Sequence, residues 1–201
     1  MNQQILLIDG ENFVHALVHS LKQKQLITSR SQLQRLQCNL LFEELGMSKS
    51  AVIRYYTTKL QLKSSPKELL PTLQRMRKWN DRWIPYLANQ GITFIKAGIL
   101  RARDAKRCRK CGHKGYVLLE KGVDVRLAVD IATLGGRGTT LYFLSSDTDL
   151  LASLQVARQQ STKIIYVTFE GQLINAMARQ ADKTIVISNR QIFKAFKEHN
   201  G

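Results

Sequence analysis

Short apolar runs alternate with amphipathic stretches along most of this 201-residue chain. Four consecutive apolar residues at 5–8 predict a strand buried on both faces, as in a parallel sheet. Further strands are predicted at 51–57, 92–95, 116–119, 140–145, 163–167 and 183–187. Helical spacing of apolar residues predicts helices at 13–21, 29–45, 69–89, 122–134, 148–157, 173–180 and 190–198. The alternation predicts a doubly wound α/β sandwich with a mostly parallel sheet.

Aspartate follows two of the predicted buried strands and opens one of the predicted helices. Asp9 comes directly after the apolar run at 5–8, and Asp147 follows the strand predicted at 140–145. Asp124 lies in the first turn of the helix predicted at 122–134. Because ligands of open parallel sheets bind outside the carboxyl ends of the strands, these acids mark the most favourable place for a site.

Each of these acids also has a simpler interpretation. Asp147 can cap the following helix, where Ser146 and Asp149 resemble a loose capping box, and Asp124 can complement a helix dipole. Three carboxylates brought to one place repel one another, which costs free energy unless a cation or a proton offsets it. Mg²⁺ and Mn²⁺ prefer carboxylate and water oxygens, so the pattern favours one of these ions.

Charge narrows the class of partner. The chain has 31 Lys and Arg residues against 15 Asp and Glu, a net charge of +16, which favours nucleic acid. No apolar run approaches the roughly 18 residues of a membrane span, and no amphipathic basic helix indicates binding to a membrane surface. The odd number of cysteines, 3, fits a reducing compartment, so we expect a cytoplasmic protein with residues 1–201 in a single domain.

The most basic segment, 101–114, contains eight Arg, Lys and His residues out of fourteen. We expect a loop or small insertion at about 101–115 that contacts phosphates. The predicted nucleic-acid-binding residues are the arginines and lysines of this segment and the nearby Lys121: Arg101, Arg103, Lys106, Arg107, Arg109, Lys110, Lys114 and Lys121. Cys108, Cys111 and His113 form half of a zinc knuckle. Three interpretations stay open: Zn²⁺ completed by a distant ligand or by the partner chain of a homo-oligomer, a reduced loop on RNA, and a redox pair.

Three segments carry a resemblance to a known family. IDGEN at 8–12, EKGVDVRLAVD at 120–130 and SSDTDL at 145–150 resemble the signature segments of the NYN domain family, relatives of the PIN-like nucleases. The resemblance implies a Rossmann-like, PIN-type three-layer sandwich whose clustered acids bind Mg²⁺ or Mn²⁺ and hydrolyse RNA. The positions that match the acidic site are Asp9, Asp124, Asp147 and Asp149, with the first three as metal ligands.

The same segments suggest supporting residues. Asn12 matches the polar residue that follows the first acid, and Ser146 lies between the strand end and Asp147. Asp130 also fits the motif, but it lies about 120° around the helix from Asp124, so we expect it to support the site rather than bind metal.

The combined interpretation is a metal-dependent endoribonuclease that acts on RNA, with single-stranded RNA as its partner. The alternative is a non-catalytic RNA-binding or regulatory protein on the same fold. Clustered carboxylates favour the enzyme, because a pure binder of polyanions gains nothing from them. His15 and His19 are four residues apart on the first helix but lack a third ligand, so we expect them to be surface or core histidines.

Overall fold

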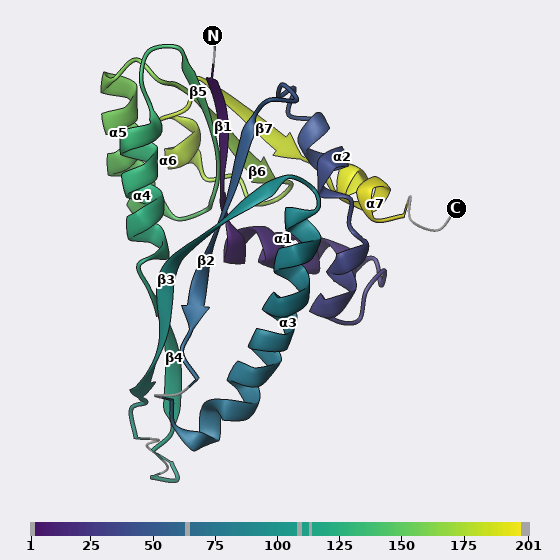
Figure 1. Ribbon diagram of the computed structural model, residues 1–201, viewed down its shortest axis with the longest axis vertical. Coiled ribbons are helices and arrows are strands. Elements are labelled where there is room, and N and C mark those ends of the chain that lie inside the picture. The colour runs from purple at the N-terminus through teal and green to yellow at the C-terminus, as the bar shows by residue number, and fades with distance from the viewer. Residues whose placement is uncertain (1–2, 63–64, 108–109, 113, 198–201) are drawn as a thin grey trace.

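The structure, a computed structural model, describes residues 3–62, 65–107, 110–112 and 114–197 (Figure 1). Seven strands in this part of the chain form one sheet in the order β4-β3-β2-β1-β5-β6-β7. All neighbouring pairs are parallel except the edge pair β3 and β4, which is antiparallel. The strands are β1 (Gln3–Asp9), β2 (Val52–Leu60), β3 (Ile92–Asp104), β4 (Tyr116–Lys121), β5 (Thr139–Leu144), β6 (Lys163–Phe169) and β7 (Lys183–Ile187).

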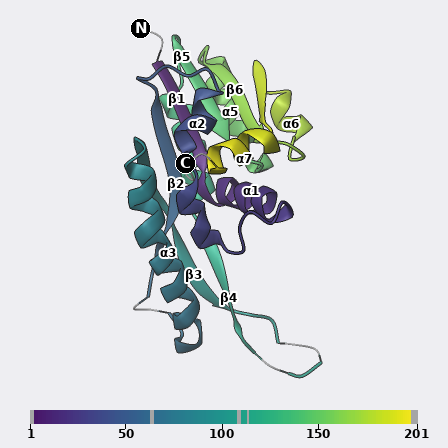
Figure 2. The same ribbon diagram turned by 90° about the vertical axis from the view of Figure 1, so that its right-hand side faces the viewer.

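Helices cover both faces of the sheet (Figures 1 and 2). One face carries α1 (Gly10–Gln23), the 3₁₀ helix η1 (Arg30–Arg35), α2 (Cys38–Glu43), α3 (Leu70–Ala88), which follows the short 3₁₀ helix η2 (Lys67–Leu69), and α7 (Asn189–Lys197). The other carries α4 (Val123–Leu134), the 3₁₀ helix η3 (Thr148–Leu150), α5 (Leu151–Gln159) and α6 (Asn175–Ala178). The prediction of an α/β sandwich with a mostly parallel sheet is confirmed.

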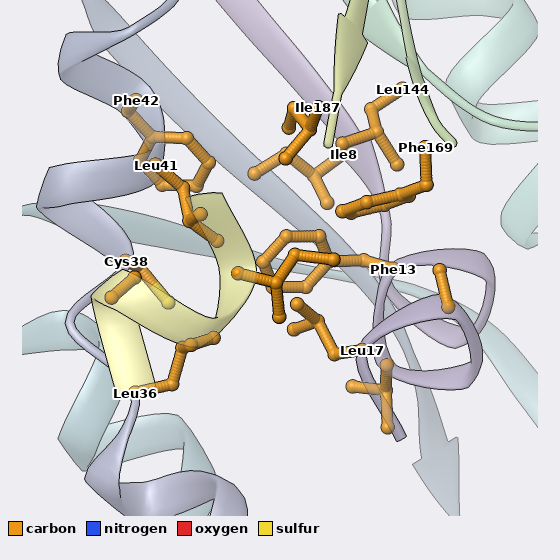
Figure 3. Close-up of a cluster of buried hydrophobic side chains, with 14 of the residues drawn as sticks. Ile8, Phe13, Leu17, Leu36, Cys38, Leu41, Phe42, Leu144, Phe169 and Ile187 are labelled. Atoms are coloured by element: carbon orange, nitrogen blue, oxygen red, sulfur yellow. The ribbon is translucent and has the colours of Figure 1, made fainter. Parts of the chain in front are cut away.

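The central strand β1 divides the core into two layers because its side chains alternate between the faces. Leu6 and Ile8 belong to the cluster under α1, α2 and α7, which Figure 3 shows, whereas Ile5 and Leu7 belong to the cluster under α4 and α5. All four are at most 2% exposed, which explains the unbroken apolar run in the sequence. Asp9 continues the register of Ile5 and Leu7 and therefore points to the α4 face.

The continuous helix predicted at 29–45 is wrong. The chain forms η1, turns to an extended conformation at Leu36 (φ −82°, ψ 123°), and then forms the short α2. Backbone amides at the break bond to other elements: the N–H of Gln37 donates to the carbonyl of Ala195, and the N–H of Cys38 donates to Oε1 of Gln90. These tertiary hydrogen bonds, together with full burial of Leu36, outweigh the helical periodicity.

The loop predicted at about 101–115 is shorter than expected. Strand β3 continues to Asp104 and pairs with β4, from Ile99 opposite Lys121 to Asp104 opposite Tyr116, as a hairpin that extends away from the rest of the sheet (Figure 2). Along residues 100–103 exposed arginines alternate with less exposed apolar residues. The high charge conceals this two-residue period, since only a small alanine stands between Arg101 and Arg103.

Two helices differ in how well their predicted extent holds. Helix α3 (Leu70–Ala88) agrees with the helix predicted at 69–89 and continues through Pro85. The helix predicted at 173–180 is reduced to the four residues of α6. No helix within the described ranges is both long enough and apolar enough to cross a bilayer.

Candidate acidic site

The carboxyl ends of β1 and β5 meet because these strands are neighbours, with Ile8 opposite Leu144. Gly10 starts α1 directly at the strand end, where a Cβ would lie 2.4 Å from the carbonyl oxygen of Tyr56. Gly122, at φ +102°, turns the chain from β4 into α4, which brings Asp124 to the same edge. We call the resulting cavity, of about 380 Å³, the acidic pocket. It is lined by Asp9, Glu11, Asn12, His15, Tyr56, Thr57, Thr58, Glu120, Val123, Asp124 and Asp147.

Asp9 is held in place by uncharged donors. Its carboxylate is buried and accepts hydrogen bonds from the backbone N–H of Asn12 (3.2 Å), from the side-chain amide of Asn12, and from the hydroxyl of Ser145 (3.0 Å). Asp9 is thus also the N-cap of α1. Ser146 donates to Oδ1 of Asn12 at 2.6 Å, so Asn12 and Ser146 form a chain of contacts that fixes the Asp9 carboxylate.

Asp147 and Asp149 have different surroundings. Asp147 caps η3 by accepting from the N–H of Asp149 (2.9 Å), and its own N–H donates to the Ser145 hydroxyl (3.1 Å). The expected cap is therefore present, yet the Asp147 side chain also lines the acidic pocket. Asp149 is exposed and is not among the lining residues of this pocket.

The pKa of Asp124 is raised by its surroundings in the pocket. Partial burial, followed by the negative charges of Asp147, Glu120, Asp9 and Asp149, raises the pKa of Asp124 from 3.8 to about 6. Each of these causes penalises the ionised form, and a bound cation would act in the opposite direction. A carboxyl group with a strongly raised pKa in a cleft is typical of a functional site, although structural clusters also produce such shifts.

The donor chemistry of this pocket fits a hard divalent cation. Asp9, Asp124 and Asp147 supply carboxylate oxygens from three elements, as Mg²⁺ and Mn²⁺ prefer. Within the described residues, however, no three or more His, Cys, Asp or Glu side chains are grouped closely enough to form a metal site as they stand. The pocket therefore contains carboxylates of the right type for a cation, but their oxygens do not lie close enough together to bind one ion in this conformation.

Asp130 lies apart from these acids. It is 4% exposed and bonds to Arg54 (3.3 Å), Arg126 (2.8 Å) and the hydroxyl of Tyr56 (2.6 Å). Burial and the Asp130 carboxylate raise the pKa of Tyr56, which keeps the phenol protonated as a donor. Because Tyr56 also lines the acidic pocket, Asp130 reaches the pocket only through this side chain.

The predicted phosphate-binding residues follow the β3–β4 hairpin. Arg101 and Arg103 are exposed on one face of β3, Lys121 ends β4, and Lys114 pairs with Asp104 at 2.6 Å. The remaining described members, Lys106, Arg107 and Lys110, are exposed in the connection between the strands.

Two of the three candidate zinc ligands, Cys108 and His113, lie outside the described part of the chain, as does Arg109. Cys111 is exposed. Cys38 lies in the core shown in Figure 3, where burial raises the pKa of its thiol, so it is not placed to complete a zinc site. The zinc interpretation therefore stays a prediction.

Several lining residues escaped the sequence analysis. Glu11 and Glu120 stand inside the motif segments, and Glu120 accepts from the N–H of Val123 at 3.0 Å at the start of α4. Tyr56 could have been found only from strand pairing, because it lies opposite Asp9 on the neighbouring strand. His15 is a surface histidine, as expected, and it lines the same pocket.

Comparison with known proteins places this geometry in context. The family model described as NYN domain matches residues 4–188. No curated protein matches the sequence. A solved structure of a protein of unknown function from Vibrio parahaemolyticus is similar, with a TM-score of 0.52 and 15% identity over 92% of this chain and 93% of that chain. At this identity the likeness establishes a shared fold and nothing further.

Proposed function

This chain belongs to the NYN domain family, and from that premise we propose that it is a metal-dependent ribonuclease that hydrolyses RNA phosphodiester bonds in the acidic pocket. The observation that carries the proposal is that Asp9, Asp124 and Asp147 all line one cavity at the carboxyl edge of the sheet. The raised pKa of Asp124 supports it, because partial burial and neighbouring carboxylates both penalise the ionised form unless a cation offsets them.

Asp9, Asp124 and Asp147 would hold Mg²⁺ or Mn²⁺. When bound, the ion lowers the pKa of a water molecule and neutralises charge on the phosphate oxygens. Asn12 and Ser145 hold the Asp9 carboxylate in one orientation, so little rearrangement is needed there. Asp124, with a pKa of about 6, is largely ionised at neutral pH, and a neighbouring positive charge would stabilise this ionised form.

The charge distribution supports RNA as the substrate. A net charge of +16 attracts a polyanion, whereas the acidic pocket by itself repels a phosphate. A divalent cation held by the carboxylates would offset this repulsion, because its positive charge attracts the phosphodiester. In a non-catalytic RNA-binding protein, the main alternative, the cluster would only weaken binding.

The test is cleavage of labelled single-stranded RNA and DNA in Mn²⁺ and in EDTA. We expect cleavage of RNA that EDTA abolishes and that Asp147→Asn lowers by at least about 10²-fold, which is roughly 2.7 kcal/mol of transition-state stabilisation. Glu44→Gln is the control, since it removes one negative charge from an exposed side chain that lines neither the acidic pocket nor a neighbouring cavity. Equal cleavage by Asp147→Asn and the parent at saturating Mn²⁺ would refute the proposal and favour the RNA-binding alternative.

A further inference from the structure

A second cavity, of about 520 Å³, adjoins the acidic pocket on the α3 side of β2. The two cavities share Glu11, Thr57 and Thr58 in their walls. Its volume falls within the roughly 300–1,000 Å³ of small-molecule sites. We call it the basic cavity, because arginine and lysine side chains from η1 and α3 line it.

Helix α3 turns a basic stripe to this cavity. Arg75, Lys78 and Arg82 are spaced at i, i+3 and i+7, which places them on one side of the helix, and all three line the cavity. None of them has an acidic partner among the described residues, whereas Arg77, off the stripe, pairs with Asp81 at 3.8 Å. Like charges on successive turns destabilise a helix slightly, so the stripe does not serve helix stability. It provides a positive surface for an anionic ligand.

The same wall ends in a column of stacked side chains. The guanidinium of Arg30 lies 4.8 Å from the ring centroid of Trp79, and Trp79 stacks on Trp83 at 5.1 Å with 22° between the planes. Trp83 stacks in turn on Tyr86 at 5.8 Å. Arg30 is fixed over the column by two contacts with the Glu11 carboxylate, at 3.1 and 3.4 Å. A fixed, planar guanidinium is a surface on which an unpaired nucleobase stacks.

This wall is not explained by the needs of folding alone. Nε of Arg30 and Nε1 of Trp79 are both buried, and neither has a hydrogen-bond acceptor within the described part of the chain. A buried donor without an acceptor reduces stability, and such groups in a native protein call for a functional reason.

We propose that the basic cavity binds one nucleotide of single-stranded RNA beside the phosphodiester in the acidic pocket. The base lies on the Arg30 and Trp79 column, and the phosphate is held by Lys78 and Arg82. Duplex RNA does not fit this mode, because its bases are paired and stacked on one another. The order of the two cavities along the strand rests on the proposed function, but binding in the basic cavity does not.

Tryptophan fluorescence reports directly on this cavity. The chain contains 2 tryptophans, and both belong to the stacked column. We therefore propose titrating the protein with a single-stranded uridine decamer in EDTA and following tryptophan emission together with the fluorescence anisotropy of a labelled decamer. We expect a saturable change of emission in parallel with binding. Uridine monophosphate should bind at least about 10-fold more weakly than the decamer, because it lacks the neighbouring phosphates.

Two variants of α3 form a matched pair. Arg82→Ala removes a charge from the cavity, and Arg77→Ala removes an identical side chain from the same helix outside it. We expect Arg82→Ala to raise the Kd for the decamer at least about 5-fold and to reduce the salt slope by about 0.7, the value for a single phosphate contact. Arg77→Ala should stay within about 2-fold of the parent. Arg30→Lys keeps the charge but loses the planar surface, so it should lose most of the emission change.

Three results would overturn the inference: no binding of the decamer, binding without a change of emission, or equal effects of Arg82→Ala and Arg77→Ala. Equal affinity for the monophosphate and the decamer would also overturn it, because the occupant would then be a free nucleotide. Melting curves of each variant confirm that the comparison is between folded proteins. These binding results can be separated from catalysis. Cleavage that depends on Asp147 without these binding effects refutes only the nucleotide-binding role of the basic cavity. Binding without cleavage refutes only the proposed ribonuclease function.

Discussion

Replacing Asp124 by asparagine should stabilise the metal-free protein at neutral pH. The carboxylate lies close to other acids, and the raised pKa means that the folded state disfavours its ionised form. Asparagine keeps the size of the side chain and removes the charge. In the absence of metal, the variant should therefore be free of the desolvation penalty and the repulsion that the ionised parent carries.

The pKa gives the sign and the size of this effect. A folded-state pKa of about 6 against an ordinary value of 3.8 means that the stability contributed by Asp124 is fully present below about pH 4. It is lost as the pH rises through about 6. The shift corresponds to about 3 kcal/mol without solvent screening. Because Asp124 is partly exposed, we expect about 1 kcal/mol. For a chain of this length, 1 kcal/mol is about 2–4 °C in Tm.

Urea unfolding in EDTA at a series of pH values measures this directly. The difference in unfolding free energy between Asp124→Asn and the parent should grow by about 1 kcal/mol between about pH 4 and pH 7, and then level off. Glu44→Gln is the control, because this exposed carboxylate is not among the charges that act on Asp124. Added Mn²⁺ should raise the Tm of the parent more than that of Asp124→Asn, because a ligand stabilises only the form that binds it.

A difference that does not change with pH would refute the charge-crowding argument. So would a variant that is less stable than the parent at pH 7.5. Asp124 lies in the first turn of α4, where a negative charge favours the helix dipole by about 0.3–1 kcal/mol. Loss of stability on substitution would show that the dipole outweighs the repulsion, and the acidic pocket would then be three separate helix-end acids.

Two further predictions concern the hairpin. Replacing Arg107, Arg109 and Lys110 by alanine should flatten the salt dependence of RNA affinity, by about 0.7 in the log-log slope for each phosphate contact that the substitutions remove. An unchanged slope and affinity would remove the hairpin from the RNA interface. If the cysteines bind zinc, metal analysis of protein purified without chelators should find about one Zn²⁺ per chain, or one per two chains for a shared site, and Cys111→Ser should abolish it. Folded protein without zinc would leave the basic-loop and redox interpretations.

The sequence predicts the position of the acids well because the relevant signal is local. Each buried parallel strand appears as a continuous apolar run, and the residue after the run lies at the carboxyl edge wherever the strand falls in the sheet. Asp9 and Asp147 could therefore be assigned to the same edge of the sheet without a known strand order. The pairing of β1 with β5 then brings both into the wall of the acidic pocket. Their role as metal ligands remains a prediction, since proximity does not establish coordination.

The surroundings of these acids depend on long-range contacts that no local pattern contains. Asp130 matches the motif, and its pairing with Arg126 is a local i, i+4 contact on α4. Its contacts with Arg54 and Tyr56, however, follow from how α4 packs across β2. The break of the helix predicted at 29–45 has the same origin, because its free amides are satisfied by Gln90 and by α7. The contact of Arg30 with Trp79 is likewise long-range, because the two residues are almost fifty positions apart.

The end of β2 has a particular importance in this arrangement. The register between β2 and β3 shifts between Thr57 and Thr58, and these two threonines separate the acidic pocket from the basic cavity. A shift of register increases the local twist of a strand and re-aims its side chains. Neighbouring threonines can therefore face both cavities at once. Carboxylates lie on one side of this strand end and guanidinium groups on the other. The acidic pocket can therefore hold a cation while the basic cavity next to it holds an RNA strand, without direct contact between the acids and the phosphates.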